Sequence, residues 1–409
     1  MDPPATKLTN LLEPRARLVP AAEAEGRIGR LQAALRKQAL DAALVVQNAD
    51  LYYFSGSVQQ AQLYVPAEGE ATLFVRRTVE RAIAESPLAV VPLPGVKHLP
   101  ALVIERYGAL PARVGLELDV LPVNAFRRYE KLLPAAAFAD ISPAIVALRA
   151  VKSAFEIELI GAAAAVADTV CGRIPQILRA GLTEAEFAGK VEAEARALGH
   201  QGIVRMRAFN GEMFYGQLLT GVSGTVPTGL DTPLGGTGLS PAVAQGVSFK
   251  RIARDEPVVF DFVPVVNGYT ADFTRMFVVG KLAAELQRAF AVALHIEHEV
   301  AAMAKPGVVC RALYDTALAI AADEGLAAEF MGHGPGQVRF IGHGVGLELD
   351  ELPVLSANDL ALAEGMVFAL EPKFVLPGLG AIGIENTFCV RSDGIVALTT
   401  SPEVIYEVD

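Results

Sequence analysis

The sequence has no tryptophan and only three cysteines among its 409 residues, Cys171, Cys310 and Cys389. Their spacing matches neither a disulfide framework nor a zinc-binding motif. We therefore expect buried structural thiols in a reducing compartment, most simply the cytoplasm. The sequence also lacks a charge-free apolar run of about 18 residues and an N-terminal signal peptide, so we expect no transmembrane span.

Positive charge is scarce as well. The chain has 35 lysine and arginine residues against 46 aspartate and glutamate residues, which gives a net charge of −11. The basic residues are scattered along the chain, which argues against a nucleic-acid partner. Hydrophobic residues make up 52% of the chain and charged residues 20%, which excludes a disordered protein.

Residues 1–150 alternate between helical and β-type patterns. Residues 1 to about 20 are expected to form a loose arm. Apolar residues then recur at helical spacing in RIGRLQAALRKQAL (27–40), and the β-type run DAALVVQ follows. Later β-type and helical segments continue this alternation, which predicts an α/β domain that ends near residue 150.

Residues 151–409 follow a different pattern. Capping boxes at Ser153 and Thr183 predict two helices at the start of this part. Residues 211–249 are rich in glycine, threonine, serine and proline, and such a long connection is expected to be functional or to pack over a site. Strands and helices are then grouped separately, which predicts an α+β domain.

Two aspartates lie inside apolar β-type runs. Asp261 belongs to VVFDFV and Asp272 to YTADFTRMFVV, and the Asn267–Gly268 pair between them predicts a two-residue hairpin turn. This turn makes the two aspartates diagonal neighbours, about 7–8 Å apart. A divalent cation between them would relieve their repulsion. Alternatively, one aspartate pairs with Arg275 and the other lies at a bulge.

Three more potential ligands follow in apolar or glycine-rich segments. His343 lies in FIGHGVGLELDELP, Glu371 in MVFALEPKFV and Glu385 in GAIGIENTFCV. Four carboxylates and one imidazole suit Mn, Co, Fe or Zn. Bridging carboxylates can hold two such ions about 3.5–4 Å apart and lower the pKa of a water between them.

The ordered motifs NGYTADFTR, GHGVGLELDE, FALEP and GIENT resemble those of the M24 family of metallopeptidases, which includes aminopeptidase P, prolidase and methionine aminopeptidase and has the pita-bread fold. The segment from Arg27 to Gly56 resembles the N-terminal domain of creatinase and aminopeptidase P. LRAVKSAFEIELIGAA resembles the usual entry to the catalytic domain. The resemblance covers residue 25, approximately, to the end of the chain.

This resemblance implies an α/β creatinase-like domain over residues 1–150 and an α+β pita-bread catalytic domain over residues 151–409. It also implies a homodimer and two divalent ions, with a metal-bridged hydroxide that attacks the scissile amide of an Xaa-Pro peptide. Glu371 would shuttle a proton, and Asp272 and Glu385 would bridge the ions. The five implied metal ligands are Asp261, Asp272, His343, Glu371 and Glu385.

The sequence departs from the family pattern at two places where peptidases carry histidine. Ala244 and Asp350 occupy these positions, so two donors to a peptide carbonyl are missing. His333 is a candidate replacement or a solvated loop residue, while Asp350 and Arg275 are candidates for substrate binding. The departure keeps open a creatinase-like enzyme that cleaves C–N or C–S bonds in a small amino-acid-derived substrate. A binding protein without catalysis is a third alternative, which the complete ligand set disfavours.

The HIEHE run at residues 295–299 also carries two histidines. Because the HExxH motif is absent, we expect a solvated helix face rather than a metal site.

Overall fold

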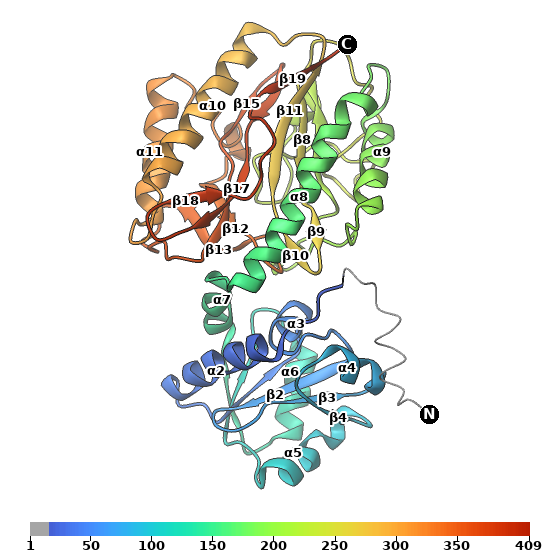
Figure 1. Cartoon of the computed structure of the whole chain (residues 1–409), viewed down its shortest axis with the longest axis vertical. Helices are drawn as coiled ribbons and strands as arrows, with labels where there is room; N and C mark the ends of the chain where they lie inside the picture. Colours follow the sequence, from blue (N-terminus) through green and yellow to red (C-terminus); the bar gives the residue numbers. More distant parts are fainter. Residues whose placement is uncertain (1–15) are drawn as a thin grey trace. The chain divides into compact units, whose positions relative to one another are not determined.

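The structure is a computed structural model that describes residues 16–409. Contacts divide the chain into a first unit that ends at Arg149 and a second unit, Ala150–Asp409 (Figure 1). Residues 1–15 of the expected N-terminal arm lie outside the described residues. Over residues 16–409, no helix combines the length and apolar character needed to cross a bilayer.

The first unit is built on a mixed six-stranded sheet in the order β4-β3-β2-β1-β5-β6. Strand β1 pairs antiparallel with β2 and parallel with β5. The apolar spacing of the first helix is explained by burial, because Ile28, Leu31 and Leu35 all face the interior. The strands are β1 Ala42–Val45, β2 Ala61–Pro66, β3 Thr72–Val75, β4 Ala89–Pro92, β5 Arg113–Leu116 and β6 Ala137–Asp140. The helices are α2 Ala21–Lys37, α3 Asn48–Ser55, α4 Val79–Glu85, η1 Val96–His98, α5 Leu99–Tyr107, α6 Val123–Leu132 and α7 Ser142–Ala150.

The second unit contains a four-stranded sheet, β19-β11-β8-β7, and a five-stranded sheet, β13-β12-β14-β17-β18. Two short pairs, β9 with β10 and β15 with β16, complete it. The strands are β7 Gly216–Thr220, β8 Val258–Phe262, β9 Val265–Val266, β10 Tyr269–Thr270, β11 Phe273–Val279, β12 Phe340–Gly344, β13 Glu351–Ser356, β14 Val367–Leu370, β15 Lys373–Leu376, β16 Gly380–Gly383, β17 Asn386–Val390, β18 Ile395–Ala397 and β19 Ile405–Val408.

Helices flank these sheets on two sides (Figure 1). One apolar core joins α8 and α9 to one face of strands β7, β8 and β11. Another joins α10 and α11 to the opposite face of these three strands and to strands β12–β17. The predicted capping boxes at Ser153 and Thr183 are both formed. The helical segments are α8 Ala154–Ile177, α9 Glu184–Ala197, η2 Gly221–Thr225, α10 Ala284–Met303, α11 Cys310–Asp323 and η3 Gly334–Gly336.

The glycine-rich stretch 211–249 is not a loop throughout, because it contains β7 and η2. Strand β7 pairs with β8, and the first residue of β7, Gly216, has φ +117°. A Cβ atom on Gly216 would lie 2.4 Å from the Asp261 carbonyl oxygen. The glycine therefore permits the close approach of two backbones beside Asp261.

The hairpin register agrees with the sequence prediction. Asn267 and Gly268 both have positive φ, as a type I′ turn requires, and Tyr269 pairs with Val266. Asp261 is paired with Thr274, two residues beyond Asp272. The predicted diagonal placement of the two aspartates is therefore confirmed.

Candidate metal centre

The five predicted ligands lie on neighbouring strands of the second unit. Asp261 is within β8, and Asp272 immediately precedes β11. His343 is within β12, while Glu371 follows β14 and Glu385 precedes β17. A bridge between Thr274 and Glu385 and the pairing of His343 with Ala369 bring these strands together. All five side chains are buried or nearly so, the most exposed being Asp261 at 11%.

The backbone orients His343 as a ligand. Its Nδ1 lies 3.2 Å from the Leu349 carbonyl oxygen and 3.3 Å from that of Gly344, so Nδ1–H donates to backbone oxygen. This tautomer leaves the lone pair of Nε2 directed to the carboxylates. Nε2 lies 3.5 Å from Asp272 Oδ2 and 3.7 Å from Glu371 Oε1.

A lysine that the sequence analysis missed lies among the carboxylates. Lys373 Nζ donates to Asp261 Oδ2 at 2.9 Å, Glu371 Oε2 at 2.7 Å and Glu385 Oε2 at 2.8 Å. The lysine side chain is only 2% exposed. Its position two residues after Glu371 was an available signal, because alternate residues of an extended chain point to the same side.

The donor set around His343 fits a metal ion. Asp272, His343 and Glu385 offer ligand atoms that all lie within 4.8 Å of one another. Glu385 Oε1 is buried and has no hydrogen-bond partner, whereas Oε2 accepts from Thr274 Oγ1 and Lys373 Nζ. A buried carboxylate oxygen without a partner is costly, and a cation would satisfy it. Two carboxylates and an imidazole nitrogen suit a divalent transition metal.

The electrostatics indicate the same need for positive charge. Burial, followed by the charges of Glu385 and Asp261, raises the pKa of Asp272 well above its usual range. Burial also raises the pKa of Asp261 and that of Glu385, although Lys373 opposes the shift in both. Burial lowers the pKa of Lys373, but the carboxylates of Asp261, Glu371 and Glu385 outweigh it and raise that pKa. The lysine is therefore charged, and the raised pKa values of the carboxyl groups show that further positive charge would stabilise their ionised forms.

Arg275 does not face this cluster. Its guanidinium is fully buried behind it and donates to the Glu385 and Ser401 carbonyl oxygens and to Asn386 Oδ1. It also stacks over the Phe273 ring at 4.4 Å. The prediction that Arg275 binds substrate is therefore wrong: alternation along β11 turns it away from Asp272 and Thr274. Its role is to hold the backbone that carries Glu385.

Asp350 and His333, the other predicted site residues that are not metal ligands, differ in whether they reach the cluster. Asp350 lines the cavity at the cluster, is 49% exposed, and places Oδ1 3.6 Å from His343 Nδ1. His333 is exposed and is not among the cavity residues. It follows Gly332, whose φ is +111°, at the start of the short turn η3, which directs the side chain outward. The structure therefore does not support His333 as a replacement catalytic donor.

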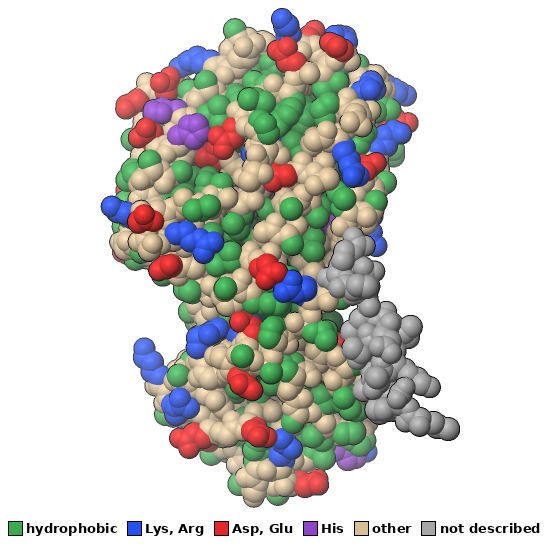
Figure 2. All heavy atoms as spheres, in the orientation of Figure 1, with side chains coloured by type: hydrophobic (Ala, Val, Ile, Leu, Met, Phe, Trp, Pro, Cys, Tyr) green, Lys and Arg blue, Asp and Glu red, His purple; other side chains and the backbone are tan. Residues whose placement is uncertain are grey.

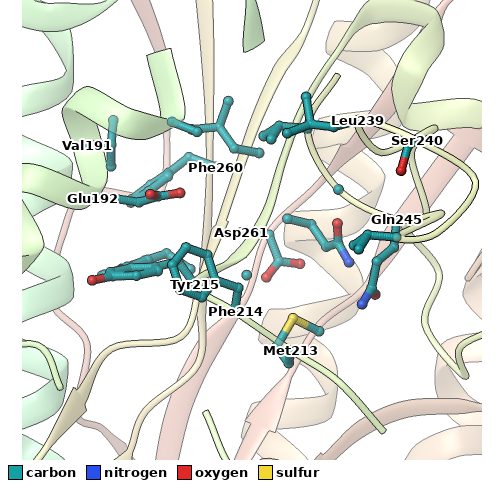
Figure 3. A pocket seen from close by; sticks show the side chains of 18 residues that line it. Val191, Glu192, Met213, Phe214, Tyr215, Leu239, Ser240, Gln245, Phe260 and Asp261 are labelled. Carbon is teal, nitrogen blue, oxygen red and sulfur yellow. The ribbon is translucent and has the colours of Figure 1, made fainter. Parts of the chain in front are cut away.

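Two adjoining cavities reach the cluster. One, of about 480 Å³, is lined by Asp261, Asp272, His343, Asp350, Glu371 and Lys373 among others. His343 is the sole histidine among the described residues that line it. The second, of about 330 Å³, is mainly apolar and shares Met213, Gln217 and Asp261 with the first. In Figure 3 the Asp261 carboxylate lies in this second cavity between Phe260 and Met213.

Features outside the cluster refine two further predictions. The three cysteines are buried free thiols, as expected. In the HIEHE run, His295, His298 and Glu299 are exposed as expected, but Glu297 is only 1% exposed. Glu297 and His298 also form, with Glu403, a second group that could hold a metal ion, which the sequence did not predict. Over the visible face, acidic and basic side chains are interspersed on both units (Figure 2).

Comparisons with known proteins agree with the motifs. Residues 158–392 match the model of metallopeptidase family M24, and residues 27–151 match the creatinase/prolidase N-terminal domain. The Xaa-Pro dipeptidase of Pyrococcus horikoshii is 30% identical over 375 residues, which cover 90% of this chain and 95% of that protein.

Solved structures give the same result. The prolidase from Pyrococcus horikoshii OT3 has a TM-score of 0.77 at 26% identity and covers 92% of this chain and 99% of its own. The X-Pro aminopeptidase from Thermotoga maritima MSB8 has a TM-score of 0.77 at 25% identity, with 93% and 99% covered. The predicted fold class, a creatinase-like α/β domain followed by a pita-bread α+β domain, is confirmed. The chain belongs to metallopeptidase family M24, a family of metal-dependent hydrolases.

Proposed function

We propose that this chain hydrolyses an amide bond in a small peptide-like substrate, with Xaa-Pro dipeptides as the first class to test. The observation that carries this proposal is the group formed by Asp272, His343 and Glu385 at a cavity of about 480 Å³. Cavities of this size suit small ligands. The Xaa-Pro dipeptidase of Pyrococcus horikoshii, 30% identical to this chain, supports the substrate class.

Asp272, His343, Glu371 and Glu385 would hold the divalent ion. A bound ion would lower the pKa of a water molecule and polarise the scissile carbonyl group. Glu371 is the carboxylate that we assign to proton transfer: it accepts a proton from the attacking water and passes it to the leaving nitrogen as the C–N bond breaks. The water oxygen ends on the carbonyl carbon.

The cavity surroundings indicate how a substrate is held. Asp350, half-exposed at the cavity, suits a free amine or another cationic group of the substrate. The adjoining apolar cavity, with Phe260 and Val191 among its lining residues, suits an apolar side chain. Both features favour a short substrate with a charged end and an apolar group.

A second candidate is cleavage of a C–N or C–S bond in a small amino-acid-derived substrate. It is favoured by the lack of a second histidine among the described residues of the cavity, where Asp350 stands instead. Ala244, the other position that departs from the family pattern, is exposed, and its neighbours Val243 and Gln245 line the apolar cavity. Without the two histidine donors, an oxyanion formed from a peptide loses the stabilisation that they would supply.

We further propose a cytoplasmic homodimer, on the basis of the family resemblance and of the three buried free thiols. The mass in solution, measured by light scattering after gel filtration, tests the dimer. A monomeric mass across the working concentration range would contradict it.

The activity is tested with the full chain, stripped of metal and reloaded with Mn, Co or Zn. Xaa-Pro dipeptides, other dipeptides and small amides are incubated with it, and released amino acids are quantified by mass spectrometry. We expect metal-dependent release of proline by the wild type and none by Asp272→Asn. If no amide is cleaved with any metal, the peptide assignment fails and the second candidate is favoured.

A further inference from the structure

We propose that the Lys373 ammonium takes the place of a second metal ion, so that this cluster binds one divalent ion per chain rather than the two that the family motifs imply. The inference rests on the proposed function in one respect: both require a divalent ion at this cluster. It concerns the number of ions and is measured without substrate.

The carboxylate oxygens divide into two sets. The ammonium takes Asp261 Oδ2, Glu371 Oε2 and Glu385 Oε2, at distances of 2.7–2.9 Å. Since an ammonium has three N–H donors, all of them are used. Glu371 and Glu385 each retain one further oxygen, and that of Glu385 has no hydrogen-bond partner. Each of these two glutamates therefore connects the lysine to the position of the ion.

The retained atoms form one complete ligand set. They are His343 Nε2, Asp272 Oδ2, Glu371 Oε1 and Glu385 Oε1. Asp272, His343 and Glu385 belong to the group whose atoms lie within 4.8 Å, whereas Asp261 does not. One imidazole with three carboxylates is a sufficient donor set for a single divalent transition metal.

A second ion would compete directly with the lysine. Neither Asp261 nor Glu371 belongs to the group within 4.8 Å, but Glu371 Oε1 lies 3.7 Å from His343 Nε2, whereas Asp261 Oδ2 accepts from Lys373. An ion that used Asp261 together with Glu371 and Glu385 would lie next to the ammonium, which already occupies one oxygen of each of these carboxylates. It would also place a divalent charge next to a buried monovalent one, which is unfavourable in a medium of low dielectric.

The surrounding strands are built to accommodate the lysine. Lys373 begins β15 and pairs with Gly383 on β16. A Cβ atom at Gly383 would lie 2.6 Å from Lys373 Cγ, so the lysine stem occupies the space that any larger residue would fill. The Lys373 carbonyl oxygen also accepts from the Met331 backbone N–H at 2.8 Å. Backbone pairing on both sides thus fixes the direction of this side chain.

The test is the metal content of the full chain after equilibrium dialysis against Mn²⁺, measured by mass spectrometry and by electron paramagnetic resonance. We expect one equivalent in the wild type, with the hyperfine pattern of an isolated ion. Lys373→Met, which keeps the stem and removes the charge, should gain a second equivalent and the broadened spectrum of a coupled pair. Two equivalents in the wild type, or only one in folded Lys373→Met, would overturn the proposal.

Two further variants keep the test decisive if Lys373→Met does not fold. Asp261→Asn should bind the same single equivalent of Mn²⁺ as the wild type. In a two-ion site the same variant would bind one equivalent fewer than the wild type. Total loss of metal from folded Asp261→Asn would contradict the proposal. Lys250→Met is the matched control, because Lys250 pairs with Glu256 outside the cluster. Its metal content should equal that of the wild type, and a gain there would show that added metal binds elsewhere.

Because metal is counted in the absence of substrate, this result is independent of the proposed function. A chain with one ion that cleaves no amide would retain the inference and lose the assignment. A chain with two ions that cleaves Xaa-Pro dipeptides would do the reverse.

Discussion

Arg275 should support the folded state and the position of Glu385 rather than bind substrate. Its guanidinium donates to the carbonyl oxygens of Thr274 and Glu385 at 2.8 and 2.9 Å, and to Asn386 Oδ1 at 2.7 Å. It also donates to the Ser401 carbonyl oxygen at 2.7 Å. Replacement by methionine keeps much of the stem but leaves these buried acceptors without donors.

The expected loss is large. Leaving a buried acceptor without its donor costs about 1–3 kcal/mol, so losing these four bonds together should cost at least about 3–5 kcal/mol. In a unit of this size, 1 kcal/mol corresponds to about 2–4 °C in the melting temperature. Arg275→Met should therefore melt about 6–20 °C below the wild type. The matched control is Arg173→Met, which breaks a half-exposed pair with Glu194 and should cost about 0.2–1 kcal/mol.

Melting temperatures are measured by circular dichroism on metal-free protein, so that bound metal does not mask the effect. KM is then measured below the melting range with a substrate that the wild type cleaves. A structural role predicts a large loss in melting temperature for Arg275→Met and a small one for Arg173→Met. The reasoning is refuted if Arg275→Met melts within about 2 °C of the wild type and mainly raises KM.

Three other predictions follow from the same site. The two histidine donors missing at Ala244 and Asp350 would each stabilise the transition state by about 3 kcal/mol, so kcat on Xaa-Pro dipeptides should be about 10⁴-fold below the typical value of about 10 s⁻¹. The double variant Ala244→His with Asp350→His should raise this kcat, which steady-state kinetics measure; an unchanged kcat would contradict the role of the missing histidines. Asp272→Ala should abolish metal binding and activity, which dialysis with metal analysis checks; retained metal would contradict the ligand assignment. Burial and then Glu403 raise the pKa of Glu297 to about 8, so its folded-state proton is held more tightly than in the unfolded chain. Stability should thus fall between about pH 4.5 and pH 8, and Glu297→Gln should flatten that fall in melting temperature; equal slopes would argue against it.

The backbone arrangement of the site could be predicted from sequence because local chemistry determines it. Asn267 and Gly268 favour a turn with positive φ at both residues, and the turn fixes the register that places Asp261 diagonally to Asp272. The capping boxes depend on short-range contacts in the same way. His343 was predicted as a ligand from the family motif, and the structure adds the backbone contact that orients its ring.

Side-chain direction could not be predicted equally well. Lys373 follows Glu371 within a quoted motif, yet lysine is rarely buried, and only three carboxylates from separate strands make its burial favourable. Arg275 lies one residue from Thr274, but strand alternation sends it to the opposite side. Glu297 looked solvated on helical periodicity alone, whereas contact with Asn386, 89 residues away in sequence, places it inside.

Anomalous diffraction from crystals of the full chain grown with Mn²⁺ tests the central claim most directly, because it locates the ion and the lysine together. The account predicts one anomalous peak per chain, among Asp272, His343, Glu371 and Glu385. Lys373 Nζ should remain beside Asp261. Two peaks with Lys373 displaced would contradict the single-ion site, and no peak at saturating Mn²⁺ would contradict the metal centre itself.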